Sequence, residues 1–166
     1  MPVPLVVAQS RAVPVEVERA FAQTLTMPLT SIFSQRYGLL PPVSQIRDQH
    51  EAWGRTGQTR TVVTRDGGTM RELLVDVDAP RSFSYRLSDV TGVLRPLIAG
   101  IDGRWEFVPT GTGTSITWSW TVHPTSAGAL VLPVVMSRLW PGYARLGLEQ
   151  LSEQLLAPAS GGSASA

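Results

Sequence analysis

Three residues of this sequence are our candidates for acid–base chemistry: His50, Glu72 and Tyr85. A histidine titrates near neutral pH, so it can both accept and give up a proton. A carboxyl group withdrawn from water has a raised pKa and can do the same. A tyrosine hydroxyl donates a hydrogen bond. We take His50 and Glu72 as candidate catalytic groups for proton transfer and Tyr85 as the candidate donor.

The residue types that are absent exclude several other mechanisms. The sequence has no cysteine, lysine or asparagine, and all 14 of its basic residues are arginine. Disulfides, thiolate nucleophiles, Schiff-base lysines, P-loops and N-glycosylation sites are therefore excluded. His50-Glu51 begins like a zinc-protease helix, but Gly54 occupies the position of the second histidine. With no catalytic triad, metal-ligand set or nucleotide motif, we predict no cofactor and no metal.

The charge pattern argues against nucleic acid as a partner. The formal net charge is +1, and the arginines are scattered rather than gathered into a basic stripe. The most apolar run, Gly128 to Met136, is far shorter than the ~20 residues that span a bilayer. The first residues lack the charged start of a signal peptide. We expect a cytoplasmic protein without an integral membrane segment.

Strands dominate the pattern of the chain. Turn residues such as Asp66-Gly67-Gly68 separate short segments of β-forming residues, and such a series predicts an antiparallel meander. The last segment alternates most clearly, with Trp118 and Trp120 on its apolar face and Thr117 and Ser119 on its polar face. The predicted strands cover residues 5–10, 45–53, 58–65, 69–77, 82–88, 101–108 and 114–123.

Helices are expected in two places. Pro14 and the glutamates that follow it predict the start of a short helix, and a second short helix is predicted over residues 29–33. A long helix is predicted over residues 126–156, with a kink or break near Trp140 because Pro133 and Pro141 interrupt it. Residues 157–166 are small and polar and are expected to be a disordered tail after a single domain, 1–156.

This order of elements predicts an α+β fold. A curved seven-stranded antiparallel sheet wraps around the long C-terminal helix, so that the two apolar faces bury each other. Charged residues make up only 16% of the chain, against about 25% in a typical protein. That shortfall fits extra apolar surface, and a strongly curved sheet leaves an internal cavity that the helix does not fill.

Several short stretches point to a known family when taken together with this order. They are 48–53 (DQHEAW), 57–60 (GQTR), 66–69 (DGGT), 71–72 (RE), 78–86 (DAPRSFSYR), 103–109 (GRWEFVP) and 113–114 (GT) with Trp118. The chain resembles the SRPBCC superfamily, also called START-like or helix-grip. Within it, the chain is most similar to the bacterial polyketide cyclase/dehydrase and lipid-transport group. The resemblance runs from about Leu5 to Leu156.

The resemblance implies the helix-grip fold and a cavity for hydrophobic or aromatic ligands, but it implies no single reaction. In such a fold, core and ligand wall are the same residues, so the inward apolar side chains become candidates for the pocket. These candidates are Phe83, Tyr85, Leu97, Trp105, Phe107, Trp118, Trp120, Met136, Trp140 and Tyr143.

The orientation of the candidate acid–base groups is open. In a helix-grip fold the strand parity of His50 turns it inward, whereas its closeness to Gly54 fits an exposed strand end. Glu72 and Asp76 share one face of their strand, but the opposite face is equally apolar, and a slip of one residue exchanges the two. The resemblance favours Glu72 inward, and for Asp76 we expect a solvated position.

Three functions follow as hypotheses. The first is binding or transport of a hydrophobic small molecule, such as a lipid, a polyketide or an aromatic compound. The second is a polyketide aromatase/cyclase or dehydratase that uses His50, Glu72 and Tyr85. The third is an interaction module, in which the apolar segment 93–100 and the run 130–136 form a homodimer or partner surface. The segment 93–100 also fits a lid over the cavity.

Overall fold

The computed structural model describes residues 2–38 and 40–157. The strands are β1 (Leu5–Val13), β2 (Val43–Arg47), β3 (Thr59–Thr64), β4 (Thr69–Asp78), β5 (Ser82–Ser88), β6 (Ile98–Thr110) and β7 (Gly113–Pro124). The α-helices are α1 (Val17–Thr26), α2 (Leu29–Ile32) and α3 (Leu132–Leu156), and 3₁₀ turns cover Gly92–Leu94 and Gly128–Leu130. From residue 158 on, the predicted tail lies outside the described residues.

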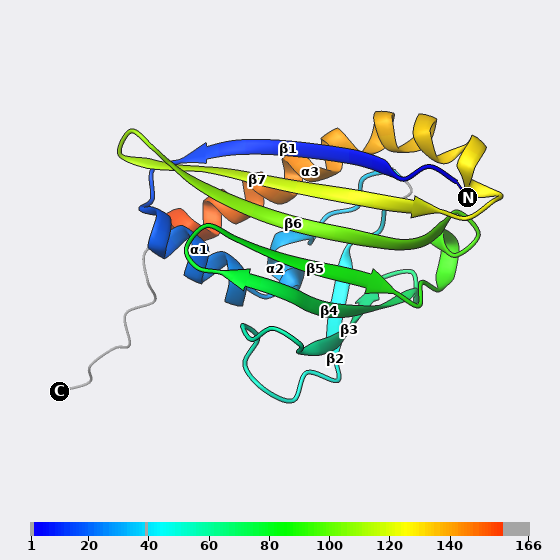
Figure 1. The fold of residues 1–166 in the computed structure, drawn as a ribbon, viewed down its shortest axis with the longest axis horizontal. Coiled ribbons are helices and arrows are strands. Elements are labelled where there is room, and N and C mark those ends of the chain that lie inside the picture. The colour runs from blue at the N-terminus through cyan, green and yellow to red at the C-terminus, as the bar shows by residue number, and fades with distance from the viewer. Residues whose placement is uncertain (1, 39, 158–166) are drawn as a thin grey trace.

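All seven strands form one antiparallel sheet in the order β1-β7-β6-β5-β4-β3-β2. The sheet curves around α3, which runs behind β1 and β7, while α1 and α2 lie on the same side of the sheet, toward the end where β5 begins (Figure 1). β2 and β3 turn away from the line of the other strands at the far edge (Figure 1). This is the α+β helix-grip fold that the sequence predicts.

The alternation of β7 and the apolar stripe of α3 explain why the two layers meet. On β7 the inward side chains Trp118 and Val122 are buried, and the outward serines and threonines are only partly so. On α3 an apolar stripe is buried, formed by Trp140, Ala144, Leu148, Leu151 and Leu155. Burying each large apolar side chain contributes roughly 1.5–3 kcal/mol, so the stripe outweighs the ~3 kcal/mol that an internal proline costs.

Of the kink or break predicted near Trp140, the break is wrong, because α3 continues through Pro141. The helix also begins later than expected, at Leu132, after a 3₁₀ turn, and Pro133 stands in its first turn where a missing N–H costs nothing. The segment 93–100 is less of a loop than predicted, since β6 already begins at Ile98.

Two backbone irregularities decide the orientation of the candidate residues. Asp48 has a positive φ of 57°, and β2 ends at the residue before it, so the predicted strand over 45–53 is wrong beyond Arg47. In β4 the register shifts between Leu74 and Asp76. This bulge switches the parity of the strand, so Glu72 is buried while Asp76 is exposed.

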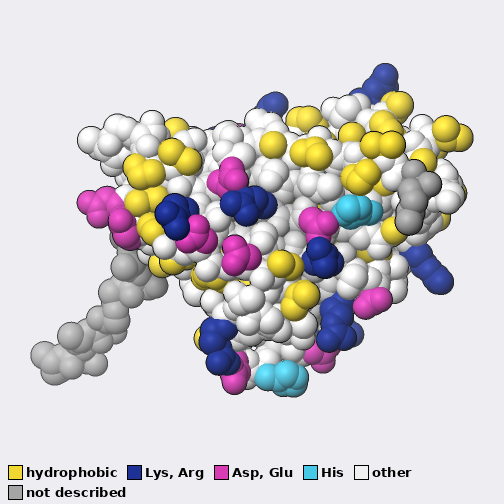
Figure 2. Space-filling view, viewed as in Figure 1, with side chains coloured by type: hydrophobic (Ala, Val, Ile, Leu, Met, Phe, Trp, Pro, Cys, Tyr) yellow, Lys and Arg dark blue, Asp and Glu magenta, His cyan; other side chains and the backbone are white. Residues whose placement is uncertain are grey.

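The outer face of the sheet has charges of both signs side by side, with apolar side chains between them (Figure 2). Arg86 Nε donates to Asp102 at 2.7 Å, and His123 Nε2 lies 2.7 Å from the other oxygen of the same carboxylate. Arg104 pairs with Glu106 at 2.7 Å. Within the described part of the chain, no helix combines the length and the apolar character needed to span a membrane.

Candidate functional site

An apolar cavity lies between the inner face of the sheet and the helices. Its volume is about 70 Å³, several times the 10–15 Å³ that one water molecule needs. α1 and α2 contribute Thr24, Leu25 and Leu29 to the wall, and α3 contributes Tyr143. Its aromatic lining is Phe33, Trp53, Phe83, Tyr85, Trp105, Trp118, Trp120 and Tyr143.

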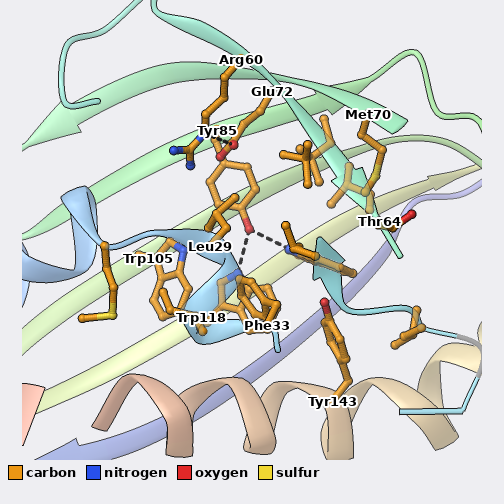
Figure 3. A pocket seen from close by; sticks show the side chains of 18 of the residues that line it. Leu29, Phe33, Arg60, Thr64, Met70, Glu72, Tyr85, Trp105, Trp118 and Tyr143 are labelled. Atoms are coloured by element: carbon orange, nitrogen blue, oxygen red, sulfur yellow. Dashed lines mark hydrogen bonds and ion pairs between the residues drawn. The ribbon is translucent and has the colours of Figure 1, made fainter. Parts of the chain in front are cut away.

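Tyr85 occupies the centre of the sheet side of this cavity. Tyr85 on β5, Gly103 on β6 and Trp120 on β7 are neighbours in one row across three strands. Because Gly103 has no side chain, the ring of Tyr85 lies over it, and a Cβ there would overlap the ring and its hydroxyl. The hydroxyl thereby accepts hydrogen bonds from the indole N–H groups of Trp118, at 2.8 Å, and Trp120, at 2.9 Å (Figure 3).

The surrounding rings hold this cluster rigid. Trp118 stacks on Trp105 with ring centroids 5.3 Å apart. Burial raises the pKa of the Tyr85 hydroxyl and outweighs the two indole hydrogen bonds, which lower it. Burial likewise raises the pKa of Tyr143. Both hydroxyls are protonated at neutral pH, so both are available as hydrogen-bond donors to a molecule in the cavity.

A buried ion pair supplies the charged part of the wall. Arg60 on β3 and Glu72 on β4 are cross-strand partners, and Arg60 Nε donates to Glu72 Oε2 at 2.6 Å. Their side chains are only 6% and 5% exposed. The guanidinium carbon lies 3.9 Å from the centre of the Trp53 ring, a cation–π contact. Arg60 Nη1 also donates to Gln49 Oε1 at 3.4 Å.

Burial makes Glu72 a weaker acid than a solvated carboxyl group, despite the ion pair. Burial raises the pKa of the Glu72 carboxyl, and the charge and hydrogen bond of Arg60, which act in the opposite direction, do not cancel this effect. A carboxyl group with a raised pKa can exchange a proton closer to neutral pH than a solvated one. Glu72 and Tyr85 line the same cavity (Figure 3), so the site combines a candidate proton carrier with a candidate donor.

The structure gathers some predicted site residues at the cavity and places others elsewhere. The predicted residues that line it are Glu72, Phe83, Tyr85, Trp105, Trp118, Trp120 and Tyr143. His50 does not join them: it is exposed in the loop after β2, where it borders a polar groove on the protein surface. The prediction that its strand parity turns it inward fails because the strand ends at Arg47.

Four further pocket candidates lie outside the cavity wall. Phe107 is buried at the α1 end of the sheet, with its ring centroid 5.4 Å from that of Phe21. Met136 and Trp140 are buried in the core under α3, and Leu97 packs its backbone against Gly128. The alternation of side chains along strands and helices correctly predicts that Phe107, Met136 and Trp140 point inward. It does not predict where along the curved sheet the cavity lies.

Residues that the sequence reasoning missed include Arg60, Trp53 and the α1–α2 side chains. Arg60 alternates with Val62 and Thr64 on the buried face of β3, and an arginine at an apolar position opposite a glutamate is the signal that could have identified it. Within residues 2–38 and 40–157, no three His, Asp or Glu side chains come together in a group that could hold a metal ion.

Exposed apolar residues gather at the other end of the molecule. Leu130 is 88% exposed, and Val131 and Val134 at the start of α3 are about half exposed. The backbone of Leu97 lies against Gly128, which brings the segment 93–97 next to this region. Of the segment 93–100, Leu94 lines the cavity. The lid and the homodimer both stay predictions.

Comparison with known families decides the relationship of this chain. The family described as "Polyketide cyclase / dehydrase and lipid transport" matches residues 4–155. The chain belongs to this family. This membership and the observed fold place the chain in the SRPBCC superfamily. Both support the interpretation that the fold is one that binds hydrophobic ligands. No protein with a curated description matches the sequence.

Solved structures with low sequence identity share the fold. The protein TTHA0849 from Thermus thermophilus is 17% identical and superposes with a TM-score of 0.71 over 94% of this chain and 100% of its own. Norcoclaurine synthase from Thalictrum flavum, in complex with dopamine and hydroxybenzaldehyde, is 16% identical with a TM-score of 0.67, over 93% of this chain and 88% of its own. Ara h 8.0201 is 17% identical with a TM-score of 0.62, over 93% and 99%.

Proposed function

We propose that this protein binds or carries a hydrophobic small molecule, of the lipid, polyketide or aromatic class, in its internal cavity. The observation that carries the proposal is the cavity wall itself. Rings from β5, β6, β7 and α3 surround a space that stays open although close packing is the rule in protein interiors. Ring-rich walls favour ring-containing ligands, because stacked and edge-on contacts add to the burial of apolar area.

The charged groups of the cavity fit a neutral ligand better than a charged one. Arg60 is the cation among the described lining residues, and Glu72 already neutralises it. The interior therefore offers a neutral, mostly apolar surface with a few hydroxyl groups. A norcoclaurine synthase of the same fold has been crystallised with two small aromatic compounds, which supports a ligand of that size for this cavity.

Native mass spectrometry after gentle purification tests the proposal, together with solvent extraction and a thermal-shift screen of an apolar library. A ligand at 100 times its Kd stabilises the folded state by about 2.7 kcal/mol, which raises Tm by several degrees for a chain of this length. If no apolar molecule co-purifies and no library compound raises Tm, the proposal is wrong.

The second candidate function is an aromatase/cyclase or dehydratase. It is favoured by one observation: Glu72, with a raised pKa, and the protonated Tyr85 line the same cavity. Such chemistry needs a cavity that folds a reactive chain and one group that moves a proton. Exposed His50 has no part in it. Turnover of a polyketide-like substrate that survives Glu72→Gln and Tyr85→Phe would remove this candidate.

A further inference from the structure

The hydroxyl of Tyr85 has an unusual hydrogen-bond inventory. A phenol oxygen accepts through its lone pairs and donates through a single hydrogen. In this protein it accepts from two indole N–H groups, those of Trp118 and Trp120. Among the described residues, the structure records no acceptor for its own hydrogen. Tyr85 is only 8% exposed and lines the cavity, so a molecule in the cavity can supply the acceptor.

The two indole groups also determine which hydrogen-bonding role the Tyr85 hydroxyl has toward a ligand. Indole N–H groups donate only, so they hold the hydroxyl in the acceptor role on their side and leave its hydrogen for another partner. A hydroxyl that accepts two hydrogen bonds is polarised and becomes a stronger donor. The ring fills the space that a side chain at position 103 would occupy, and the two indole hydrogen bonds hold its hydroxyl in place. The donor is thus preorganised before any ligand arrives.

This inference rests on the proposed function and narrows the ligand class. We propose that the ligand is a neutral ring compound with a carbonyl oxygen, and that this oxygen accepts the hydrogen bond of Tyr85. A carboxylate or phosphate ligand would need an unpaired cation, and Arg60 is paired with Glu72. An alcohol would bring its own hydrogen, which would then need a further acceptor. A carbonyl needs a donor alone, which is what Tyr85 offers.

The test compares two compounds with one skeleton, indane and 1-indanone, which differ by a carbonyl in place of a methylene. Their Kd values are measured by isothermal titration calorimetry for the wild type, Tyr85→Phe and the control Tyr37→Phe, since Tyr37 does not line the cavity. A hydrogen bond contributes about 0.5–1.5 kcal/mol, so Tyr85→Phe should weaken 1-indanone binding by about 3–10-fold. Indane binding should stay within about twofold.

Infrared spectroscopy provides a second readout, which is independent of affinity. The carbonyl stretch of 1-indanone bound to the wild type should lie at a lower wavenumber than in hexane, because hydrogen bonding weakens the C=O bond. In Tyr85→Phe the wavenumber should change, because the phenol donor is gone and the two indole N–H groups have lost their acceptor. An unchanged wavenumber in this variant would assign the donor to a water molecule or another side chain, and would overturn the proposal.

The remaining outcomes separate this inference from the function on which it rests. If both compounds bind and the bound carbonyl has the same stretching frequency as in hexane, the cavity binds apolar molecules but Tyr85 donates no hydrogen bond to the carbonyl. If Tyr85→Phe weakens indane and 1-indanone equally, Tyr85 acts by packing alone, and the inference is again overturned. If neither compound binds the wild type, the proposed function and the inference fail together.

Discussion

The ring of Tyr85 lies directly over the Cα of its cross-strand partner Gly103, in the space that any other residue at that position would fill. Gly103 sits between Tyr85 and Trp120 in one row of the sheet, so the missing side chain lets the hydroxyl of one reach the indole of the other. A glycine inside a strand usually weakens it, by roughly 0.5–1 kcal/mol relative to alanine. Here it creates the cavity's central donor.

Gly103→Ala should therefore destabilise the protein by about 1–3 kcal/mol, the usual range for overpacking, as measured by urea unfolding. The decisive comparison uses the background Tyr85→Ala, in which the ring is gone. There the same change should become stabilising by roughly 0.5–1 kcal/mol, because alanine suits a strand better than glycine. An equal loss of stability in both backgrounds would show that Tyr85 is not what occupies the space.

Removing the Tyr85 hydroxyl should cost more than removing that of Tyr143. Tyr85→Phe leaves two buried indole N–H groups without their acceptor, and each unsatisfied group costs about 1–3 kcal/mol. Tyr143 is also buried, but the structure gives its hydroxyl no hydrogen bond within the described residues, so Tyr143→Phe should change the free energy of unfolding by less than about 1 kcal/mol. Equal effects in chemical denaturation would contradict the hydrogen-bond network.

The Arg60–Glu72 pair should behave as a unit. Arg60→Met leaves a buried carboxylate without its partner and should cost about 3–5 kcal/mol at neutral pH. The double variant Arg60→Met/Glu72→Met removes both charges and should recover most of that loss, because apolar replacement of a buried pair is often neutral. Additive losses in this double-mutant cycle would mean that the two side chains are not coupled.

The raised pKa of Glu72 predicts the sign of a pH dependence. The folded protein holds the proton of Glu72 to higher pH than the unfolded chain, whose carboxyl titrates near 4.5. The contribution of this group to stability is therefore fully present below about pH 4.5 and falls as the pH rises through the folded-state pKa.

Glu72→Gln removes this titration, so the unfolding free energy of the wild type minus that of the variant should decrease with rising pH in this window. Glu153→Gln, at an exposed position on α3, controls for the loss of one negative charge. A difference that instead grows with pH would mean that Arg60 lowers the pKa of Glu72 below its usual value.

The parts of the fold that depend on alternation could be predicted from the sequence, and those that depend on curvature could not. The inward face of β7 and the stripe of α3 follow from side-chain periodicity. The inward position of Glu72 did not, because the bulge at Val75 switches parity within a strand that looks apolar on both faces. For His50 the sequence left two positions open, and the structure has the exposed one, because β2 ends before the positive φ of Asp48, which has no clear signature in the sequence.

The wall of the cavity shows the same division. Aromatic residues on β5, β6 and β7 were identified by parity, but Phe107 lies at the α1 end, beyond the cavity. Trp53 was missed because its role arises from a contact between a loop and a strand, which no periodicity encodes, whereas the alternation of β3 could have identified Arg60. The position of the cavity depends on where α1 and α2 meet the sheet, a relationship between residues far apart in the sequence.

The central claim is that the cavity holds an apolar ligand, and a matched pair of substitutions on β4 tests it most directly. Met70 lines the cavity, whereas Val75 lies on the outer face, 38% exposed. Indane binding is measured by isothermal titration calorimetry for the wild type, Met70→Trp and Val75→Trp, with folding checked by circular dichroism. We predict that Met70→Trp fills the cavity and weakens binding by at least about tenfold, an effect near 1.4 kcal/mol, while Val75→Trp binds like the wild type. Equal affinities in all three folded proteins, or no binding by any of them, would contradict the account.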